Sequence, residues 1–450
     1  MPVIAALFCQ NTFPAARDYS LKWQRDKDRI DADVRDLSLP TLLERIASET
    51  GWQVFVEPGA KHTASAKFSN LASGDALRLL LGDLNFALVP QTNASPRLYV
   101  FRTAMHNATQ RVRGAADKPD TARLKRVPNE LIVRVKPGTD IEKLARLLGA
   151  KVVGRIAELN AYRLQLDDAA ATESARDQLA RLQDVTDVDY NYYFDEPSPS
   201  RGLLASSASP LSLRLKPPGD SGRIVVGLID TAVQPLGNEL DAFFLKSLSV
   251  AGESQIEGRS PTHGTAMAET ILRSLEMITK GSTSAQILPV DVYGPNANTT
   301  TWNVGLGILE AVNGGANVLN LSLGGGSDSA MLRDLVKKVH DKGIPIFAAA
   351  GNEPVATPFF PAAYPEVVAV TAAEQGRIAD YANFGSFVDV AAPDANVVYY
   401  RNQPWFVHGT SAAAAYTTGM AAGLADTSKK SWSEVQAIVQ KTLAVPAGGK

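Results

Sequence analysis

Short apolar runs recur through the second half of the chain, and helical stretches separate them. The clearest runs are 224–229, 287–292, 318–322, 344–349 and 367–371. Continuous apolar runs of this length suit strands of a parallel sheet that helices cover on both faces. We therefore expect residues 223–450 to form an α/β domain with a doubly wound, mostly parallel sheet, in which functional residues gather beyond the carboxyl ends of the strands.

Residues 127–195 combine strand and helix periodicities in a smaller block. Alternating apolar positions mark strands and helical stripes mark helices, at 131–135, 141–148, 161–166, 175–182 and 185–190. The order strand–helix–strand–strand–helix–strand is that of a ferredoxin-like fold. The following stretch, 196–222, is rich in proline and serine, which predicts an extended, accessible linker of the kind that proteases cut.

Another block, residues 32–106, predicts a small α+β domain with no catalytic constellation of its own. Its elements are a helix, a strand, a second helix and the two strands of a hairpin, at 42–50, 52–56, 73–84, 86–89 and 98–101. Gly51 stops the first helix, and Ser73 is placed to cap the second. Residues 107–126 are polar and charged, which indicates a linker.

The order and spacing of apolar positions over residues 37–101 resemble the short N-terminal domain of secretins and TonB-dependent receptors. This implies a Gram-negative envelope protein, periplasmic or secreted, in which the domain docks a partner; an unrelated small α/β module is the alternative. Residues 1–31 include a short apolar core at 2–8 and suggest a degenerate or truncated export signal, with a frayed terminus as the alternative. Cys9 would be removed with such a signal.

Composition and charge exclude several classes of protein. The formal charge of −2 gives no global basic field that would point to nucleic acid. Cys9 is the only cysteine, which excludes an internal disulfide framework and thiolate-based zinc sites. No apolar run reaches the roughly 18 residues that a membrane-spanning helix needs.

Four polar residues stand out in the second half of the chain. Asp230 ends the first apolar run, His263 lies in PTHGTAMAET, Asn352 follows FAAAG, and Ser411 lies in HGTSAAAAYTTG. Taken singly, an Asp at a strand end, a His before Gly or a Ser before an alanine run is more often a cap or a loop residue. Together they supply the groups that acyl transfer requires.

Each of these groups has a place in acyl transfer. A serine hydroxyl is a weak nucleophile at neutral pH and needs an adjacent base. An imidazole, with a pKa of about 6.5, can take that proton and return it. A buried carboxylate fixes the imidazole tautomer and stabilises the imidazolium, and an amide beside the serine donates to the developing oxyanion.

The order Asp230, His263, Ser411 and the windows around these residues resemble the subtilisin family of serine peptidases, over about residues 223–445. The resemblance implies that Ser411 is the nucleophile, His263 the general base and acid, and Asp230 its orienting carboxylate. Asn352 and the Ser411 backbone N–H would form the oxyanion hole. The substrate groove would be lined by Ser322, Leu323, Gly324, Gly325, Ala350 and Gly351. No acidic loop matches the family's calcium sites, so we expect neither a metal nor a cofactor.

Residues 127–195 resemble the inhibitor-like propeptide that precedes many members of this family. We therefore expect a serine endopeptidase made as a zymogen, which cuts itself within 196–222 and has its own propeptide and peptide or protein substrates as partners. Ala232 and Ala415 stand where the family has glycine and proline, and Ala266 where a second histidine is common. Ala232 and Ala415 favour an alternative, a catalytically weak pseudopeptidase that acts as an envelope binding protein.

Overall fold

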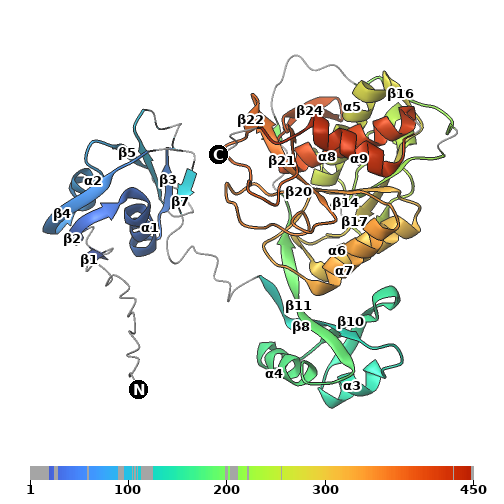
Figure 1. Ribbon diagram of the computed structural model, residues 1–450, viewed down its shortest axis with the longest axis horizontal. Coiled ribbons are helices and arrows are strands. Elements are labelled where there is room, and N and C mark those ends of the chain that lie inside the picture. Colours follow the sequence, from blue (N-terminus) through green and yellow to red (C-terminus); the bar gives the residue numbers. More distant parts are fainter. Residues whose placement is uncertain are drawn as a thin grey trace, which may run out of the picture. The chain divides into compact units, whose positions relative to one another are not determined.

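The computed structural model describes residues 20–24, 29–57, 60–89, 96–103, 105, 108, 110–112, 125–197, 201–202, 211–219, 222–254, 256–428 and 430–446. The chain divides into two compact units, Met1–Ala122 and Arg123–Lys450. Figure 1 shows the elements of each. The predicted export signal, including Cys9, lies outside the described residues except at 20–24 and 29–31.

The first unit packs two helices against two small sheets. The helices are α1 (Leu39–Thr50) and α2 (Ser73–Leu81). The sheets have the strand orders β1-β2-β4 and β5-β6-β3-β7. The strands are β1 (Ser20–Gln24), β2 (Arg29–Ser38), β3 (Gln53–Val56), β4 (Thr63–Ala72), β5 (Asn85–Val89), β6 (Arg97–Phe101) and β7 (Gln110–Val112). Helices and both sheets share one core, to which Leu21, Leu42, Leu77 and Leu98 belong.

The first helix and the hairpin of this unit confirm the sequence pattern. Every position of the predicted apolar face of α1 is buried, and Gly51 ends the helix with a left-handed φ of 72°. β5 and β6 pair antiparallel, as predicted. The predicted cap at Ser73 is wrong, because Ser73 is the first residue of α2 and the N-cap position belongs to Ala72.

One predicted boundary and one predicted linker fall on strands of this unit. β2 crosses the boundary placed between residues 31 and 32, and β1, upstream of it, adds Leu21 to the core. β7 lies in the predicted linker 107–126 and pairs with β3. β1 and β2 do alternate apolar with polar residues, at Leu21 and Trp23 and at Ile30, Ala32 and Val34, so the sequence carried a strand signal that the prediction did not use. β7 has only three residues, too few for a pattern.

The second unit begins with the predicted ferredoxin-like arrangement. Its elements are β8 (Arg126–Val135), α3 (Ile141–Leu147), β9 (Lys151–Ile156), the 3₁₀ helix η4 (Ala157–Leu159), β10 (Ala161–Gln165), α4 (Ala169–Leu179) and β11 (Val185–Asp195). The strands lie in the order β11-β8-β10-β9, and each neighbouring pair is antiparallel. Asp140 and Asp168 cap the two α-helices through their side chains. Below, these elements are called the ferredoxin-like domain.

The rest of the second unit, the α/β domain, is built on the parallel sheet that the apolar runs predict. The strand order is β15-β17-β14-β19-β20-β21-β22, and β23 pairs with β21. All neighbours are parallel except β21 and β22. The strands are β14 (Val225–Asp230), β15 (Leu248–Ser249), β17 (Gln286–Asp291), β19 (Val318–Leu321), β20 (Ile346–Ala349), β21 (Val368–Glu374), β22 (Arg377–Ile378) and β23 (Val390–Pro393).

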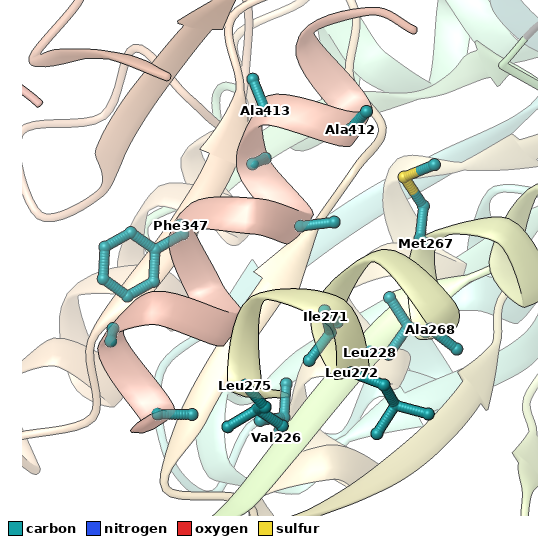
Figure 2. Packing of buried hydrophobic residues seen from close by; sticks show 14 of the residues in the cluster. Val226, Leu228, Met267, Ala268, Ile271, Leu272, Leu275, Phe347, Ala412 and Ala413 are labelled. Atoms are coloured by element: carbon teal, nitrogen blue, oxygen red, sulfur yellow. The ribbon is translucent and has the colours of Figure 1, made fainter. Parts of the chain in front are cut away.

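Helices cover both faces of this sheet, which confirms the doubly wound arrangement (Figure 1). The helices are η5 (Glu239–Phe243), α5 (His263–Thr279), α6 (Thr301–Asn313), α7 (Ala330–Asp341), α8 (Thr410–Thr427) and α9 (Trp432–Thr442). Val226 and Leu228 of β14 share a core with α5, α8 and α9, and Figure 2 shows them beside Ile271. The alternate residues Val225 and Ile229 belong to the core on the other face, with α6 and α7.

α8 is buried on nearly every side, and its small residues permit this. Figure 2 shows Ala412 and Ala413 in the same cluster as Met267 and Ala268 of α5. At Gly419 a Cβ would come within 2.5 Å of the carbonyl oxygen of Ile271, so only glycine allows the two helices to approach this closely. The tight packing fixes α8, whose first turn carries Ser411, against α5, whose first residue is His263.

The predicted linker 196–222 is partly built into the α/β domain, so the expectation of a wholly accessible segment is wrong. Two short strands in it, β12 and β13, pair with β25 of a hairpin and with β16. These strands are β12 (Arg201–Gly202), β13 (Arg214–Leu215), β16 (Ser282–Thr283), β24 (Asn396–Tyr400) and β25 (Gln403–Val407). Leu213 is buried in the main core, and Lys216 pairs with Asp426 at 3.1 Å. Residues 198–200, 203–210 and 220–221 lie outside the described residues.

Candidate active site

Asp230 ends β14 at the carboxyl edge of the sheet, and its side chain is fully buried. Its Oδ1 accepts hydrogen bonds from the backbone N–H of Thr231 and from Nδ1 of His263, both at 2.7 Å. Oδ2 is buried without a hydrogen-bond partner among the described residues. Because a carboxylate can only accept, the neutral imidazole carries its proton on Nδ1 and leaves Nε2 as an acceptor.

His263 is the first residue of α5, and local contacts fix its position. Thr262 caps the helix with its hydroxyl. The N–H of Gly264 donates to Oγ1 of Thr231 at 2.8 Å, and a Cβ at Gly264 would lie 2.2 Å from the Thr231 carbonyl oxygen. Only glycine permits this approach. The His-Gly pair therefore holds the start of α5 against the end of β14, and His263 against Asp230.

Ser411 is the second residue of α8 and is 6% exposed. Gly409, with a φ of 124°, makes the turn into the helix. The Ser411 hydroxyl donates to the carbonyl oxygen of Ser322 at 3.0 Å. In the described part of the chain no hydrogen bond joins Ser411 to His263. The structure thus pairs His263 with Asp230, and Ser411 with Ser322.

Asn352 lies just beyond β20 and is exposed. Its Oδ1 accepts hydrogen bonds from the N–H and the hydroxyl of Thr410, both at 2.9 Å. The Thr410 hydroxyl in turn accepts from the N–H of Gly351 at 3.2 Å, and Gly351 has a φ of 106°. Because Oδ1 of Asn352 already accepts these two bonds, the amide N–H groups of Asn352 are the ones that can donate to a ligand. They lie next to Thr410, the residue that precedes Ser411.

The predicted groove residues follow β19 and β20. Four of them are buried: Ser322, Leu323, Ala350 and Gly351. Gly324 and Gly325 are half-buried and lie against aromatic rings. A Cβ on Gly324 would lie 2.4 Å from the ring of Phe359, and one on Gly325 would lie 2.9 Å from the ring of Phe194. Glycine at both positions therefore leaves room for these rings.

The last strand of the ferredoxin-like domain runs on into this region, as Figure 1 shows for β11. The end of β11 pairs antiparallel with β18 (Asn298–Thr300) of the α/β domain. Beyond it, the N–H of Glu196 donates to the carbonyl oxygen of Ala297 at 3.0 Å. Phe194 is 1% exposed and belongs to the same core as Leu323. The ferredoxin-like domain thus sends an extended tail along the predicted groove.

Glu196 lies within electrostatic reach of the Asp230–His263 pair. Burial raises the pKa of its carboxyl, the charge of His263 opposes that rise, and the charge of Asp230 adds to it. Burial also raises the pKa of Tyr293 well above its usual range, with further contributions from Asp230 and Glu196. The Tyr293 hydroxyl donates to the carbonyl oxygen of Asp195 at 3.1 Å. The Tyr293 bond thus fixes Asp195, and the next residue, Glu196, interacts electrostatically with the predicted catalytic pair.

Phe194, Glu196 and β18 were not identified as parts of the site from the sequence. Alternating aromatic residues, Tyr190, Tyr192 and Phe194, offered a signal that this strand has an apolar partner beyond its own domain. The partner strand reads Asn-Thr-Thr and carries no apolar alternation, so no sequence pattern connects the two segments.

Polar contacts join the ferredoxin-like domain to α6 and α7. Asn191 is fully buried; its Oδ1 accepts from the N–H of Trp302 at 3.0 Å, and its Nδ2 donates to Glu130 at 2.7 Å. The Arg134 guanidinium pairs with the Asp334 carboxylate of α7. Asn191 thus provides an acceptor for a backbone N–H in the first turn of α6, and both ends of its own buried amide are paired. The ferredoxin-like domain is therefore complementary to this surface of the α/β domain.

The structure offers little for a metal ion. Within the residues that it describes, no three His, Cys, Asp or Glu side chains gather in a way that could hold one.

Among the residues that the structure describes, no helix is both long enough and apolar enough to cross a bilayer.

Two family models match the chain from residue 113 on. The subtilase family model matches residues 221–448, and the model of the fervidolysin N-terminal prodomain matches residues 113–191. The chain is 33% identical to the thermophilic serine proteinase of Bacillus sp. (strain AK1) over 230 residues, which are 49% of this chain and 57% of that protein. It is 30% identical to thermitase of Thermoactinomyces vulgaris over 226 residues, which are 48% of this chain and 80% of thermitase. The chain spans about half the length of the first two curated relatives it matches.

Two solved structures share the fold. Fervidolysin from Fervidobacterium pennivorans, a keratinolytic enzyme related to subtilisin, superposes with a TM-score of 0.51 at 19% identity over 67% of this chain and 55% of its own. The epidermin leader peptide processing serine protease of Staphylococcus aureus superposes with a TM-score of 0.53 at 16% identity over 69% of this chain and 92% of its own. At these identities the likeness shows the fold alone.

Proposed function

The chain belongs to the subtilase family, and we propose that it is a serine endopeptidase, made with its own inhibitory prodomain, in which Asp230, His263 and Ser411 form the catalytic triad. The observation that carries the proposal is the buried hydrogen bond of 2.7 Å between Asp230 and His263. A buried carboxylate that accepts from Nδ1 prepares the imidazole to take a proton at Nε2.

In the proposed reaction, the Ser411 oxygen attacks the carbonyl carbon of the scissile peptide bond while Nε2 of His263 takes the hydroxyl proton. The Ser411 hydroxyl must first leave its bond to the Ser322 carbonyl. Nε2 then returns the proton to the leaving amine, which yields an acyl-enzyme and a free amino terminus. Water, activated by the same imidazole, hydrolyses the ester and restores Ser411.

The negative oxygen of each tetrahedral intermediate needs donors. The N–H groups of Asn352 are suited to this, since its Oδ1 is already bound to Thr410. The backbone N–H of Ser411 lies in the first turn of α8, where helix N–H groups lack intrahelical partners. Two such donors, fixed before the reaction, stabilise the transition state without reorganisation.

A fluorophosphonate probe, which reacts with activated serines, tests this assignment. We expect labelling of the processed wild-type protein and none of Ser411→Ala or His263→Ala. Lys441→Ala, at an exposed residue in the last turn of α9, serves as the control and should label like wild type. Labelling that survives in Ser411→Ala would show that another residue is the nucleophile.

We further propose that residues 127–195 act as the inhibitor and folding aid of the α/β domain, and that 196–222 contains the processing site. The pairing of β11 with β18, the burial of Phe194 and the position of Glu196 beside the Asp230–His263 pair support this. Comparison of wild type with Ser411→Ala tests it: the variant should accumulate at full length, and the wild type should be cut. N-terminal sequencing of the wild-type product fixes the site. Full-length accumulation of both proteins would reject autoprocessing.

A catalytically weak binding protein is the second candidate, and one observation favours it. The Ser411 hydroxyl donates to a backbone carbonyl, not to His263. Ala415, where the family has proline, lies fully buried in α8. The probe separates the two candidates, because a binding protein of this kind leaves Ser411 unlabelled after the prodomain has been removed.

For the first unit we propose a docking role in a Gram-negative envelope and a periplasmic or secreted location. The order of apolar positions over residues 37–101 supports it. Deletion of residues 1–112, followed by cell fractionation and affinity purification, tests it. Unchanged location and unchanged partners would reject the proposal.

A further inference from the structure

A phenylalanine side chain of the α/β domain stands between two segments of the predicted substrate groove. A Cβ on Gly324 would lie 2.4 Å from the ring of Phe359, and one on Gly351 would lie 3.2 Å from the same ring. Gly324 follows β19 and Gly351 follows β20, and these strands are neighbours in the sheet. The ring therefore lies directly against both glycines, and the absence of a side chain on each leaves room for it.

Backbone contacts on both sides of Phe359 fix the place from which its ring extends. The N–H of Gly325 donates to the carbonyl oxygen of Phe360 at 2.8 Å, and the N–H of Phe360 donates to the carbonyl oxygen of Gly325 at 2.7 Å. The N–H of Ala363 donates to the Phe359 carbonyl oxygen at 2.8 Å. Because the backbone is tied to the groove segment, the ring can leave the two glycines only by rotation of its own side chain.

The space that this ring fills lies next to the reacting atoms. The Ser411 hydroxyl is 3.0 Å from the carbonyl oxygen of Ser322, two residues before Gly324. Asn352, the proposed donor to the oxyanion, directly follows Gly351. A carbonyl group that Ser411 attacks and Asn352 binds lies between these two segments. The side chain of the residue that carries this carbonyl therefore enters the space between the two glycines, where the phenylalanine ring stands.

We propose that Phe359 determines the specificity of the enzyme, because its ring fills the pocket for the substrate residue that supplies the scissile carbonyl. The substrates are then polypeptides cut after small residues, namely glycine, alanine and serine. This rests on the proposed peptidase function and adds the substrate class to it. A leucine or phenylalanine side chain at that position overlaps the Phe359 ring and is accepted only if the ring moves aside.

Internally quenched peptides that differ only at the residue before the cut test the proposal with the processed enzyme. Alanine, serine, leucine and phenylalanine are compared there, and mass spectrometry of the products verifies that the same bond is cut. We expect kcat/KM to be at least about tenfold higher with alanine than with phenylalanine, since even one methylene changes selectivity about 10- to 200-fold in a closed pocket. Equal rates, or faster cleavage after phenylalanine, would overturn the inference and leave the peptidase function intact. Failure to cleave any of the peptides would instead count against the peptidase function.

The Phe359→Ala variant tests whether the ring is the cause of this preference. Loss of the ring opens the space between the glycines, so kcat/KM for the phenylalanine peptide should rise at least about tenfold. The rate with the alanine peptide should stay close to that of wild type, which also shows that the fold and the triad are intact. Phe359→Leu, which keeps an apolar side chain, should give an intermediate preference and serves if Phe359→Ala is unstable. An unchanged preference in both variants would assign selection to another residue and reject the proposal.

Phe360→Leu is the matched control, because it removes an aromatic ring from the next residue and leaves Phe359 in place. The Phe360 ring contacts the ring of Tyr364, with centroids 4.9 Å apart, and its backbone bonds to Gly325 do not depend on the side chain. The ratio of the rates for the alanine and phenylalanine peptides should keep its wild-type value. A ratio that falls as far as in Phe359→Ala would mean that loosening of this segment widens the specificity, which would contradict the assignment to the Phe359 ring.

Digestion of reduced and alkylated lysozyme extends the test to a full-length polypeptide. Mass spectrometry should place most of the wild-type cuts after glycine, alanine and serine. Phe359→Ala should add cuts after phenylalanine and leucine. One and the same set of cuts for the two enzymes would contradict a pocket filled by Phe359.

Discussion

Phe194 of the ferredoxin-like domain lies directly against Gly325 of the α/β domain. A Cβ on Gly325 would come within 2.9 Å of the Phe194 ring, and Phe194 itself is 1% exposed. The strand that buries this ring ends at Asp195, and the next residue, Glu196, interacts electrostatically with His263. Phe194 therefore fixes the end of β11 against Gly325, one of the predicted groove residues.

Phe194→Ala should weaken the hold of the cleaved prodomain by at least about 100-fold in Kd, because loss of a buried phenylalanine ring costs several kcal/mol. The measurement is the specific activity of the processed protein over a dilution series. The concentration at which half of the full activity appears should rise by that factor in the variant. Leu147→Ala, at a side chain of the same domain that is 75% exposed, is the control and should follow wild type. Coincident curves for Phe194→Ala and wild type would mean that the ring does not anchor the inhibitor.

Asp230→Asn should lower kcat by about 10⁴-fold with little change in KM, because the amide keeps the shape of the side chain but does not stabilise an imidazolium. Steady-state kinetics with a long peptide substrate measures the effect. Circular dichroism and the melting temperature should show that the fold is intact. A variant within tenfold of wild type would mean that the 2.7 Å bond to His263 has no part in catalysis.

Asn352→Ala should lower kcat by about 10²- to 10³-fold with KM nearly unchanged, because the lost donor acts on charge that develops only in the transition state. The variant also loses the bonds from Thr410 to Oδ1. Asn352→Asp keeps an acceptor for Thr410 but cannot donate, and therefore serves as the matched control. Both variants should lose similar activity; an active Asn352→Asp would assign to Asn352 a structural role in place of the oxyanion role.

The candidate site residues that could be predicted from the sequence are those whose chemistry and local structure coincide. The run 224–229 predicts a buried parallel strand, and Asp230 must then stand at its carboxyl end, where parallel sheets place functional residues. His263 could be found because His-Gly opens a helix whose close approach to Thr231 requires glycine. In each case the signal lies within a few residues of the group itself.

The features that the sequence did not reveal depend on partners far along the chain. β12 and β13 looked like linker because each has two residues and gains its hydrogen bonds from β25 and β16. Glu196 became part of the site only because β11 reaches β18. Strand pairs of two or three residues are too short to produce an alternating apolar pattern in either segment. The high proline and serine content of residues 196–222 therefore led to the prediction of a linker.

Glu269 of α5 gives the protein a pH dependence of stability that can be measured. Its side chain is 2% exposed and accepts hydrogen bonds from the N–H of Tyr399 at 2.7 Å and from Arg273 at 3.1 Å. Burial raises the pKa of Glu269 to about 7, although these two donors oppose the rise.

In the unfolded chain the same carboxyl titrates near 4.5. Between pH 4.5 and about 7 the folded state therefore keeps a proton that the unfolded state has released. The contribution to stability is complete below pH 4.5 and is lost as the pH rises through about 7. It corresponds to about 3 kcal/mol at most.

Glu269→Gln removes this titration, so the free energy of unfolding of the variant should fall less than that of wild type between pH 4.5 and 8. Urea unfolding of Ser411→Ala and of the double variant, in which proteolysis is prevented, measures the difference. Glu239 of η5 is an exposed carboxylate that lines one cavity together with Glu269, so Glu239→Gln is the control and should keep the wild-type slope. Parallel profiles for Glu269→Gln and the reference would show that Glu269 is ionised in the folded protein throughout this range, because Arg273 then holds its charge.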